Sequence, residues 1–198
     1  MKTRMPTQKR SIEKRNLIIE KGFYLMCNEG YYNINTNDIA KYAGVSTGII
    51  YQYFNDKKDI FIEGIKIYSN NIMFPMLNVL DTEKIDVKNL DKTFSTMIDK
   101  YIKNHTMTKK AHEEIMAMIH LDDDIGSIYR ENELKTTEKI VSILENNNIK
   151  MENAKEKVHI IMGIVDNFAH EMVYHKHEDV DYNVMKDVVI KVIISILK

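Results

Sequence analysis

Residues 43–57 read AGVSTGIIYQYFNDK, and this stretch determines which fold the chain adopts. Gly44 interrupts a short apolar run and Ser46 is a good N-cap, so the pattern predicts a tight turn followed by a new helix. At about 100° per residue, Ile50 and Phe54 lie on the same side of that helix. We therefore expect these two side chains to attach the helix to the body of the protein.

Two further helices are predicted on the N-terminal side of this segment. Apolar residues recur with helical spacing over residues 17–26, and Gly30 follows at a position where helices commonly end. The second helix begins after Asn35, a good N-cap, and has Asp38 in its first turn, where negative charge is favourable. Three short helices with a glycine at the turn between the second and the third describe a helix-turn-helix.

The outward side of the third helix carries Gly48 and Gln52. A glycine within a helix costs about 1 kcal/mol relative to alanine, so its presence calls for a reason. One interpretation is that the missing side chain lets the helix backbone enter the major groove of DNA, which just admits an α-helix. The alternative is that Gly48 only relieves local crowding.

The remainder of the chain is predicted to form longer amphipathic helices. It contains few prolines, and no segment alternates between polar and apolar residues with the period of a strand. Pro75 is expected to end or kink the first of these helices. The expected fold class is therefore all-α, with about nine helices. The six longer helices are predicted at residues 56–73, 88–105, 109–120, 125–147, 152–175 and 182–197.

Composition restricts the class of protein. Hydrophobic residues make up 44% of the 198, enough for a packed core, yet no apolar run has the roughly 18 residues that a membrane span needs. Residues 1–15 lack the apolar stretch of a secretory signal, and Cys27 is the only cysteine, so an internal disulfide is impossible. These observations predict a soluble, cytoplasmic protein with no membrane partner.

Charge is unevenly distributed along the chain. Residues 1–66 carry 11 Lys and Arg against 7 Asp and Glu, whereas residues 67–198 carry 17 against 22. A basic N-terminal region suits contact with phosphates, and the alternative is an ordinary solvated surface rich in lysine. Charge alone does not separate these two interpretations.

The N-terminal third of the chain resembles the DNA-binding domain of TetR-family transcriptional regulators. The resemblance covers about residues 10–62 and keeps the family's spacing throughout. Its matching positions are Arg15 before Leu-Ile, Gly30 and Tyr31, Ile39 and Ala40, and the pattern Gly-Val-Ser-x-Gly-x-x-Tyr-x-Tyr-Phe-x-x-Lys from Gly44 to Lys57. The resemblance implies a helix-turn-helix DNA-binding domain at 1–62 and an effector-binding and dimerisation domain at 63–198. It further implies a homodimeric repressor that a small, largely apolar effector releases from a palindromic operator in double-stranded DNA.

Ten residues are candidates for contact with DNA. Gln52 is expected to pair its amide with adenine, and Thr47 to bond a base edge or a phosphate. Ile49 stands where the family usually carries Thr, which leaves an apolar surface suited to a thymine methyl group. The full set is Asn35, Thr36, Ser46, Thr47, Gly48, Ile49, Tyr51, Gln52, Tyr53 and Lys57.

Phosphate contacts are expected at the edges of this set. Tyr51, Tyr53 and Lys57 resemble the family's phosphate-contacting residues, although packing beside Phe54 is an equal alternative for Tyr53. Thr36 offers its hydroxyl at a helix N-terminus, where the helix dipole favours anions. Asn35 replaces a more usual Thr, which preserves a cap but weakens the case for a contact. Additional non-specific or minor-groove contacts are expected from Arg10, Lys14 and Arg15.

The last two predicted helices each carry an apolar face that is wide for the core of a small single chain. In TetR-like proteins these helices form a four-helix bundle with those of a second copy. The alternative is that both are ordinary core helices. Candidate dimer contacts are Val165, Phe168, Met172, Val188, Val192 and Ile196.

An effector cavity is predicted between the longer helices. The chain has 13 methionines, and this flexible, polarizable residue suits surfaces that bind varied apolar ligands, although it is also a common core filler. Together with nearby aromatic residues the methionines suggest an apolar cavity in which His120, Asp166 or His170 supplies a polar anchor. Candidate pocket residues are Phe74, Met97, Tyr101, Met116, His120, Tyr129, Asp166, Phe168 and His170.

The sequence predicts no metal site, cofactor or enzyme. His170 and His175 are five residues apart, which places them about 140° apart on a helix, and no two histidines have the i, i+4 spacing. An all-α enzyme or ligand carrier is disfavoured because no phosphate-binding loop, Gly-x-Ser-x-Gly or His-Glu-x-x-His motif occurs. A DNA-binding regulator without an effector is the other alternative.

Overall fold

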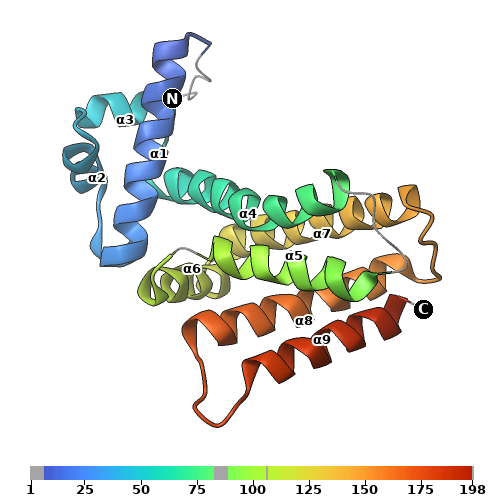
Figure 1. The fold of residues 1–198 in the computed structure, drawn as a ribbon. Coiled ribbons are helices and arrows are strands. Elements are labelled where there is room, and N and C mark those ends of the chain that lie inside the picture. The colour runs from blue at the N-terminus through green and yellow to red at the C-terminus, as the bar shows by residue number, and fades with distance from the viewer. Residues whose placement is uncertain (1–6, 83–88, 106, 198) are drawn as a thin grey trace. The chain divides into compact units, whose positions relative to one another are not determined.

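The computed structural model describes residues 7–82, 89–105 and 107–197, with the backbone alone over 70–82. Over these residues the protein is entirely helical, with nine α-helices and one short 3-10 helix (Figure 1). This confirms the expected all-α fold class. The elements are α1 (Lys9–Glu29), η1 (Tyr31–Asn33), α2 (Thr36–Ala43), α3 (Thr47–Tyr53), α4 (Lys57–Thr82), α5 (Leu90–Asn104), α6 (Lys109–Leu121), α7 (Asp123–Asn146), α8 (Ala154–Tyr174) and α9 (Tyr182–Leu197).

Helix α4 ends later than the sequence predicts. Its predicted end lay at residue 73, before Pro75, whereas the helix continues to Thr82. A proline removes only one backbone hydrogen bond of its helix, so the helix persists where the turns on either side form. Every helix in the described part of the chain is too short or too polar to span a lipid bilayer.

The chain divides into two compact units. The N-terminal unit comprises Met1–Tyr68 and Met107–Arg130, and the C-terminal unit comprises Ser69–Thr106 and Glu131–Lys198. Packing therefore groups α6 and the start of α7 with the first three helices. This division describes packing alone. The functional division into a DNA-binding domain at 1–62 and an effector-binding and dimerisation domain at 63–198 stays a prediction.

The N-terminal unit is built around a close approach of three helices at Gly22. A Cβ atom at this position would lie 2.8 Å from Ile60 Cγ2 of α4 and 3.0 Å from an Ile39 methyl of α2, so only glycine lets α1 pack this closely. Ile18, Met26, Ile39 and Ile60 are all fully buried around it. This core fixes the positions of the short helices α2 and α3.

Helix α6 completes the same core from a distant part of the sequence. Ile115 and Met118 are each 1% exposed and join the apolar cluster of the N-terminal unit. The Glu114 carboxylate accepts a hydrogen bond of 2.6 Å from the backbone N–H of Tyr31. After α6, the Asp122 carboxylate lies 2.8 Å from Lys58 Nζ. Burial acts to raise the pKa of Asp122, but hydrogen bonds from Lys58 and from backbone N–H groups outweigh it and lower that pKa.

The C-terminal unit has its own core between α5, α7, α8 and α9. Val165 and Phe168, which the sequence placed at a dimer interface, are 6% and 1% exposed within the single chain. They belong to the core of one chain rather than to its surface, because both point towards the other helices of this unit. The C-terminal core includes Phe94, Ile98, Ile140, Val165, Phe168 and Ile193.

Replacing Gly64 of α4 by alanine is expected to destabilise the N-terminal unit. The added Cβ would lie 2.3 Å from ring atoms of Phe23 and 2.6 Å from its Cβ, so α1 and α4 must separate. We expect a loss of about 1–3 kcal/mol in the free energy of unfolding, measured by chemical denaturation. Gly48→Ala is the matched control, because a Cβ there meets only Ser46 Oγ, at 3.9 Å. Equal stability of the two variants would contradict this close approach.

Candidate nucleic-acid interface

Local hydrogen bonds start α2, and one left-handed residue ends it and begins the turn to α3. The Asn35 side chain accepts from the N–H groups of Asn37 and Asp38, and the Asp38 carboxylate accepts from the N–H of Asn35. This reciprocal capping box starts α2. Gly44 ends it with φ 66° and ψ 33°, a conformation that glycine adopts without steric cost.

A side-chain hydrogen bond joins the two helices across this turn. Thr47 Oγ1 donates to Asn37 Oδ1 over 2.8 Å. Two of the predicted DNA-contacting side chains, Asn35 and Thr47, therefore already serve the local structure. The Thr47 hydroxyl oxygen keeps its lone pairs, whereas Asn35 Oδ1 already accepts two hydrogen bonds and only the amide NH2 group of Asn35 remains for another partner. The DNA contacts predicted for both residues stay predictions.

The two sides of α3 differ as the spacing predicts. Ile50 and Phe54 are 0% and 1% exposed, so they hold α3 against the core. Gly48 and Gln52 are exposed on the opposite side. The exposed part of the candidate set consists of Asn35, Ser46, Gly48, Tyr51 and Gln52, whereas Thr36, Thr47, Ile49, Tyr53 and Lys57 are half-buried.

Gly48 stands in open space. A Cβ on this residue would have the hydroxyl of Ser46 as its nearest neighbour, at 3.9 Å. Relief of crowding inside the protein therefore does not explain the glycine. The remaining interpretation is that something outside the chain approaches the backbone of α3 here.

Lys57 has a structural role that the sequence did not predict. Its Nζ donates to the carbonyl oxygens of Tyr31 and Ile34 over 2.6 and 2.8 Å and lies 4.4 Å from the centre of the Tyr31 ring. Burial lowers the pKa of this ammonium group. Two of its three N–H groups bind backbone carbonyls, so Lys57 holds the segment before α2 in place. The phosphate contact expected of Lys57 stays a prediction.

Arg15 is likewise engaged within the protein. Its guanidinium lies 2.7 Å from the Glu63 carboxylate and 5.2 Å from the centre of the Phe54 ring. Burial acts to raise the pKa of Glu63, but the hydrogen bonds from Arg15 and Lys66 outweigh it and lower that pKa. Arg15 thus supports the buried end of α3, and the exposed Arg10 is the more accessible cation on α1.

Two of the half-buried candidates also pack against the protein. Tyr53 contacts the Phe54 ring, with centroids 6.4 Å apart, and both it and Ile49 lie against the apolar core of the N-terminal unit. The packing that was the alternative for Tyr53 is therefore present. Only part of the Ile49 side chain is left to meet a thymine methyl group.

The predicted effector residues fall into separate groups. Met97 and Tyr101 line a cavity of about 50 Å³ inside the C-terminal unit, and the Tyr101 hydroxyl donates to Asp166, which lies beside His170. Phe168 is buried in the same unit. Three other candidates belong to the N-terminal unit, and the Phe74 side chain lies outside the described residues. Those three are Met116 and Tyr129, which pack against the core, and His120, which is exposed.

The cavity is apolar and almost filled. Its lining includes Phe94, Met97, Ile140, Met162 and Ile193. Sites for drug-sized ligands usually hold about 300–1,000 Å³, far more than this volume. An effector of that size would enter only after these side chains had moved.

Comparison with known proteins places these observations in context. Residues 18–63 match the family described as bacterial regulatory proteins, tetR family. The HTH-type transcriptional regulator HbdR of Aromatoleum sp. (strain CIB) is 40% identical over 75 residues, which is 38% of this chain and 28% of HbdR. The negative transcriptional regulator IcaR of the biofilm operon icaADBC in Staphylococcus aureus (strain Newman) is 24% identical over 139 residues, 63% of this chain and 74% of IcaR.

Similarity of fold extends over nearly the whole chain. A putative TetR-family transcriptional regulator from Mesorhizobium loti superposes with a TM-score of 0.76 at 16% identity, covering 96% of this chain and 98% of that one. The sequence matches are shorter, and in them the chain spans about a quarter to a half of the length of the first curated relatives. The match to the family, at residues 18–63, falls within α1–α4.

Gly48→Ala is expected to separate DNA binding from folding. The methyl group fits without contact inside the protein, so stability should stay the same or rise by up to about 1 kcal/mol. If α3 approaches DNA closely at this position, affinity for a selected duplex should fall about tenfold, as for a mismatched base pair. Fluorescence anisotropy at constant salt concentration measures the affinity for DNA. An unchanged affinity would show that DNA does not approach this side of α3.

Proposed function

Since the chain belongs to the tetR family of bacterial regulatory proteins, we propose that it is a DNA-binding transcriptional regulator acting as a homodimer on a palindromic operator. The observation that carries this proposal is the outward side of α3. It presents Gly48 and Gln52 to solvent while Ile50 and Phe54 hold the helix from behind. A helix with this division can enter the major groove without disturbing the core.

Within the groove, Gln52 is the residue suited to reading a base. Its amide can donate to and accept from the edge of adenine, the pairing that glutamine makes in the major groove. Ser46 and Tyr51 flank it on the exposed surface and are placed to contact the backbone of the duplex. Gly48 lets the helix backbone approach between them.

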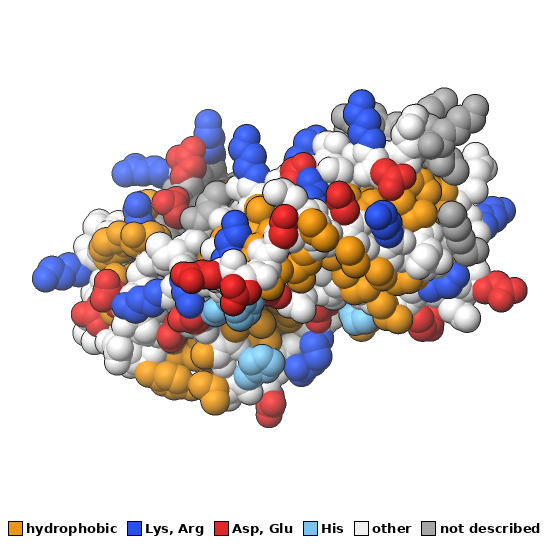
Figure 2. Space-filling view, turned by 60° about the horizontal axis from the view of Figure 1, so that its bottom comes forward, with side chains coloured by type: hydrophobic (Ala, Val, Ile, Leu, Met, Phe, Trp, Pro, Cys, Tyr) orange, Lys and Arg blue, Asp and Glu red, His pale blue; other side chains and the backbone are white. Residues whose placement is uncertain are grey.

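A second copy is proposed because one helix-turn-helix reads too few base pairs to be selective. Dimers of such proteins bind two half-sites about one helical turn apart. On α9, Val184, Val188 and Val192 follow one another at four-residue spacing and are 58%, 51% and 38% exposed. Figure 2 turns the side that carries α8 and α9 towards the viewer, and hydrophobic side chains gather there.

Helix α8 adds to this exposed apolar surface. Ile160 is 56% exposed, and a Cβ added at Gly163, one turn further along, would meet nothing within 4 Å. A mid-helix glycine with no neighbour in its own chain suits close approach of a helix from another copy. We assign the dimer contact to this surface, with Val188 and Val192 from the predicted set, and Met172 and Ile196 half-buried at its edges.

The proposed sign of regulation is repression, relieved by a small apolar effector bound in the C-terminal unit. The name of IcaR describes a negative regulator, and the cavity beside Tyr101 is the apolar space that supports an effector here. A ligand shifts such a protein only by binding one conformation more tightly than the other. An effector must therefore favour a state with a larger cavity. Action on a bacterial operator places the protein in the cytoplasm, as a binding protein rather than an enzyme.

Selection of bound sequences from random duplex DNA tests the proposed function. We expect a palindrome with half-sites about one helical turn apart. Gln52→Ala should then relax the choice at one base pair of each half-site, at a cost of about 1–3 kcal/mol for the preferred base. Enrichment of no sequence at low salt would refute DNA recognition. A uniform loss of affinity at every position would refute the role of Gln52.

Val188→Glu is expected to weaken the dimer. A charge in the centre of the exposed α9 stripe would be buried without a partner on association, so the chain should become largely monomeric at micromolar concentration. Light scattering after size exclusion measures the mass. Leu121→Glu is the control, because Leu121 is 69% exposed and lies in the N-terminal unit. If the Val188→Glu variant remained dimeric, the dimer interface would have to lie on another surface.

A further inference from the structure

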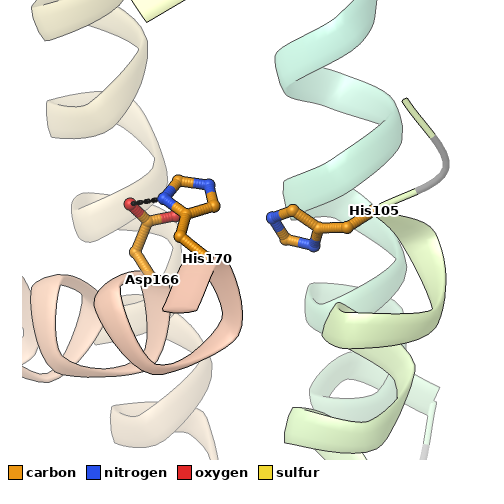
Figure 3. Close-up of side chains that lie close together, drawn as sticks. All are labelled: His105, Asp166 and His170. Atoms are coloured by element: carbon orange, nitrogen blue, oxygen red, sulfur yellow. Dashed lines mark ion pairs between the residues drawn. The ribbon is translucent and has the colours of Figure 1, made fainter. Parts of the chain in front are cut away.

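Three potential metal ligands meet between α5 and α8 in the C-terminal unit. His105 caps the C-terminus of α5, and Asp166 and His170 are one turn apart on α8. One ligand atom from each residue lies within 4.8 Å of the other two. Figure 3 shows the His105 ring directed across the gap towards the pair on α8.

The hydrogen bonds of His105 determine which nitrogen faces this cluster. Its Nδ1 lies 2.8 Å from the carbonyl oxygen of Tyr101, so Nδ1 carries the proton and donates it. The other nitrogen, Nε2, is buried and has no hydrogen-bond partner, although His105 is only 7% exposed. A buried nitrogen lone pair without a donor is costly and calls for an explanation.

The same arrangement is typical of a histidine that binds metal. Such a histidine almost always donates its other ring N–H to a carbonyl or carboxylate, which fixes the tautomer and orients the free lone pair. The carboxylate of Asp166 is also positioned by the protein, because its Oδ1 accepts a hydrogen bond from the Tyr101 hydroxyl. Tyr101 thus positions two of the three ligands.

The distances fit a small ion after a modest adjustment. His170 Nδ1 lies 3.3 Å from Asp166 Oδ2. Bonds of about 2.0–2.1 Å at tetrahedral angles place two ligand atoms about 3.3 Å apart, so this pair already matches. Bringing the His105 nitrogen to the same separation requires a movement of at most about 1.5 Å, which rotation of an imidazole at a helix end can supply.

We propose that His105, Asp166 and His170 bind a divalent transition-metal ion of the Zn²⁺ class. Two imidazoles and one carboxylate are a donor set that such ions accept, and they leave a fourth position for water or another ligand. The ion would satisfy the buried Nε2 of His105 and join the end of α5 to α8. This site goes beyond the proposed function and does not depend on DNA binding.

Charge and protonation in the cluster agree with this assignment. Burial lowers the pKa of His170, against the opposing effect of the Asp166 charge. Neutral imidazole is the form that coordinates metal. Protons compete with the ion for the same nitrogens, so metal affinity should fall as the pH drops from 7 to 5.

The test is titration of the chelator-treated full chain with Zn²⁺ and Co²⁺, without DNA. We expect one ion per chain by calorimetry, a Zn²⁺-dependent rise in melting temperature and the intense visible absorption of four-coordinate Co²⁺. His105→Phe keeps the ring packing against Tyr101 and His170 but removes both nitrogens. Asp166→Asn keeps an acceptor for Tyr101 and removes the charge.

Both substitutions should weaken Zn²⁺ binding at least about tenfold, and His177→Gln should leave it unchanged. His177 is the control because its side chain is 68% exposed and lies outside the cluster in the same unit. Asp166→Asn retains the hydrogen-bonding geometry and decides the matter if His105→Phe fails to fold. No Zn²⁺ binding by the unmodified chain, or Zn²⁺ binding by both cluster variants that is as tight as that of the unmodified chain, would overturn the proposal. A melting temperature that changes with pH but not with Zn²⁺ would show that the three residues bind protons rather than a metal ion, and would also overturn the proposal.

Discussion

Two side chains, Ile50 and Phe54, hold α3 against the rest of the N-terminal unit. A helix of seven residues is far too short to be stable alone, so its existence depends on the surface that it buries. Full burial of two such side chains contributes about 1.5–3 kcal/mol each. Arg15, which is paired with Glu63, also lies over the Phe54 ring. The exposed residues on the outward side of α3, Gly48 and Gln52, take no part in this contact.

The features that the sequence could predict are those with a local physical cause. The orientation of α3 follows from the helical period, the start of α2 from the cap at Asn35, and the turn between them from Gly44. The hydrogen bonds of Lys57 could not be predicted in this way. A motif places a lysine at a given distance from the turn, but which acceptor its ammonium reaches depends on carbonyl groups more than twenty residues earlier in the chain. Packing of α6 against α1 depends on contacts of still longer range.

The candidate site in the C-terminal unit illustrates the same limit. Spacing along one helix separates His170 from His175, and on that basis the sequence predicts no metal site. The proposed site instead combines His170 with a carboxylate four residues earlier, Asp166, and with His105 at the end of α5. Asp166 and His170 can be recognised from the sequence as candidate polar residues in an apolar region, but His105 cannot. Its significance comes from burial and from a missing hydrogen-bond partner, and neither is readable from a single sequence.

The inclusion of residues 107–130 in the N-terminal unit has a consequence for how the protein is made. The chain emerges from the ribosome in order, and α1–α3 are complete long before α6 exists. At about 5–20 residues per second, the residues from Tyr68 to Arg130 take about 3–12 s to add. During that interval the apolar surface that later receives Ile115 and Met118 has no cover from its own chain. The core of the N-terminal unit can therefore be completed only after α6 has been synthesised.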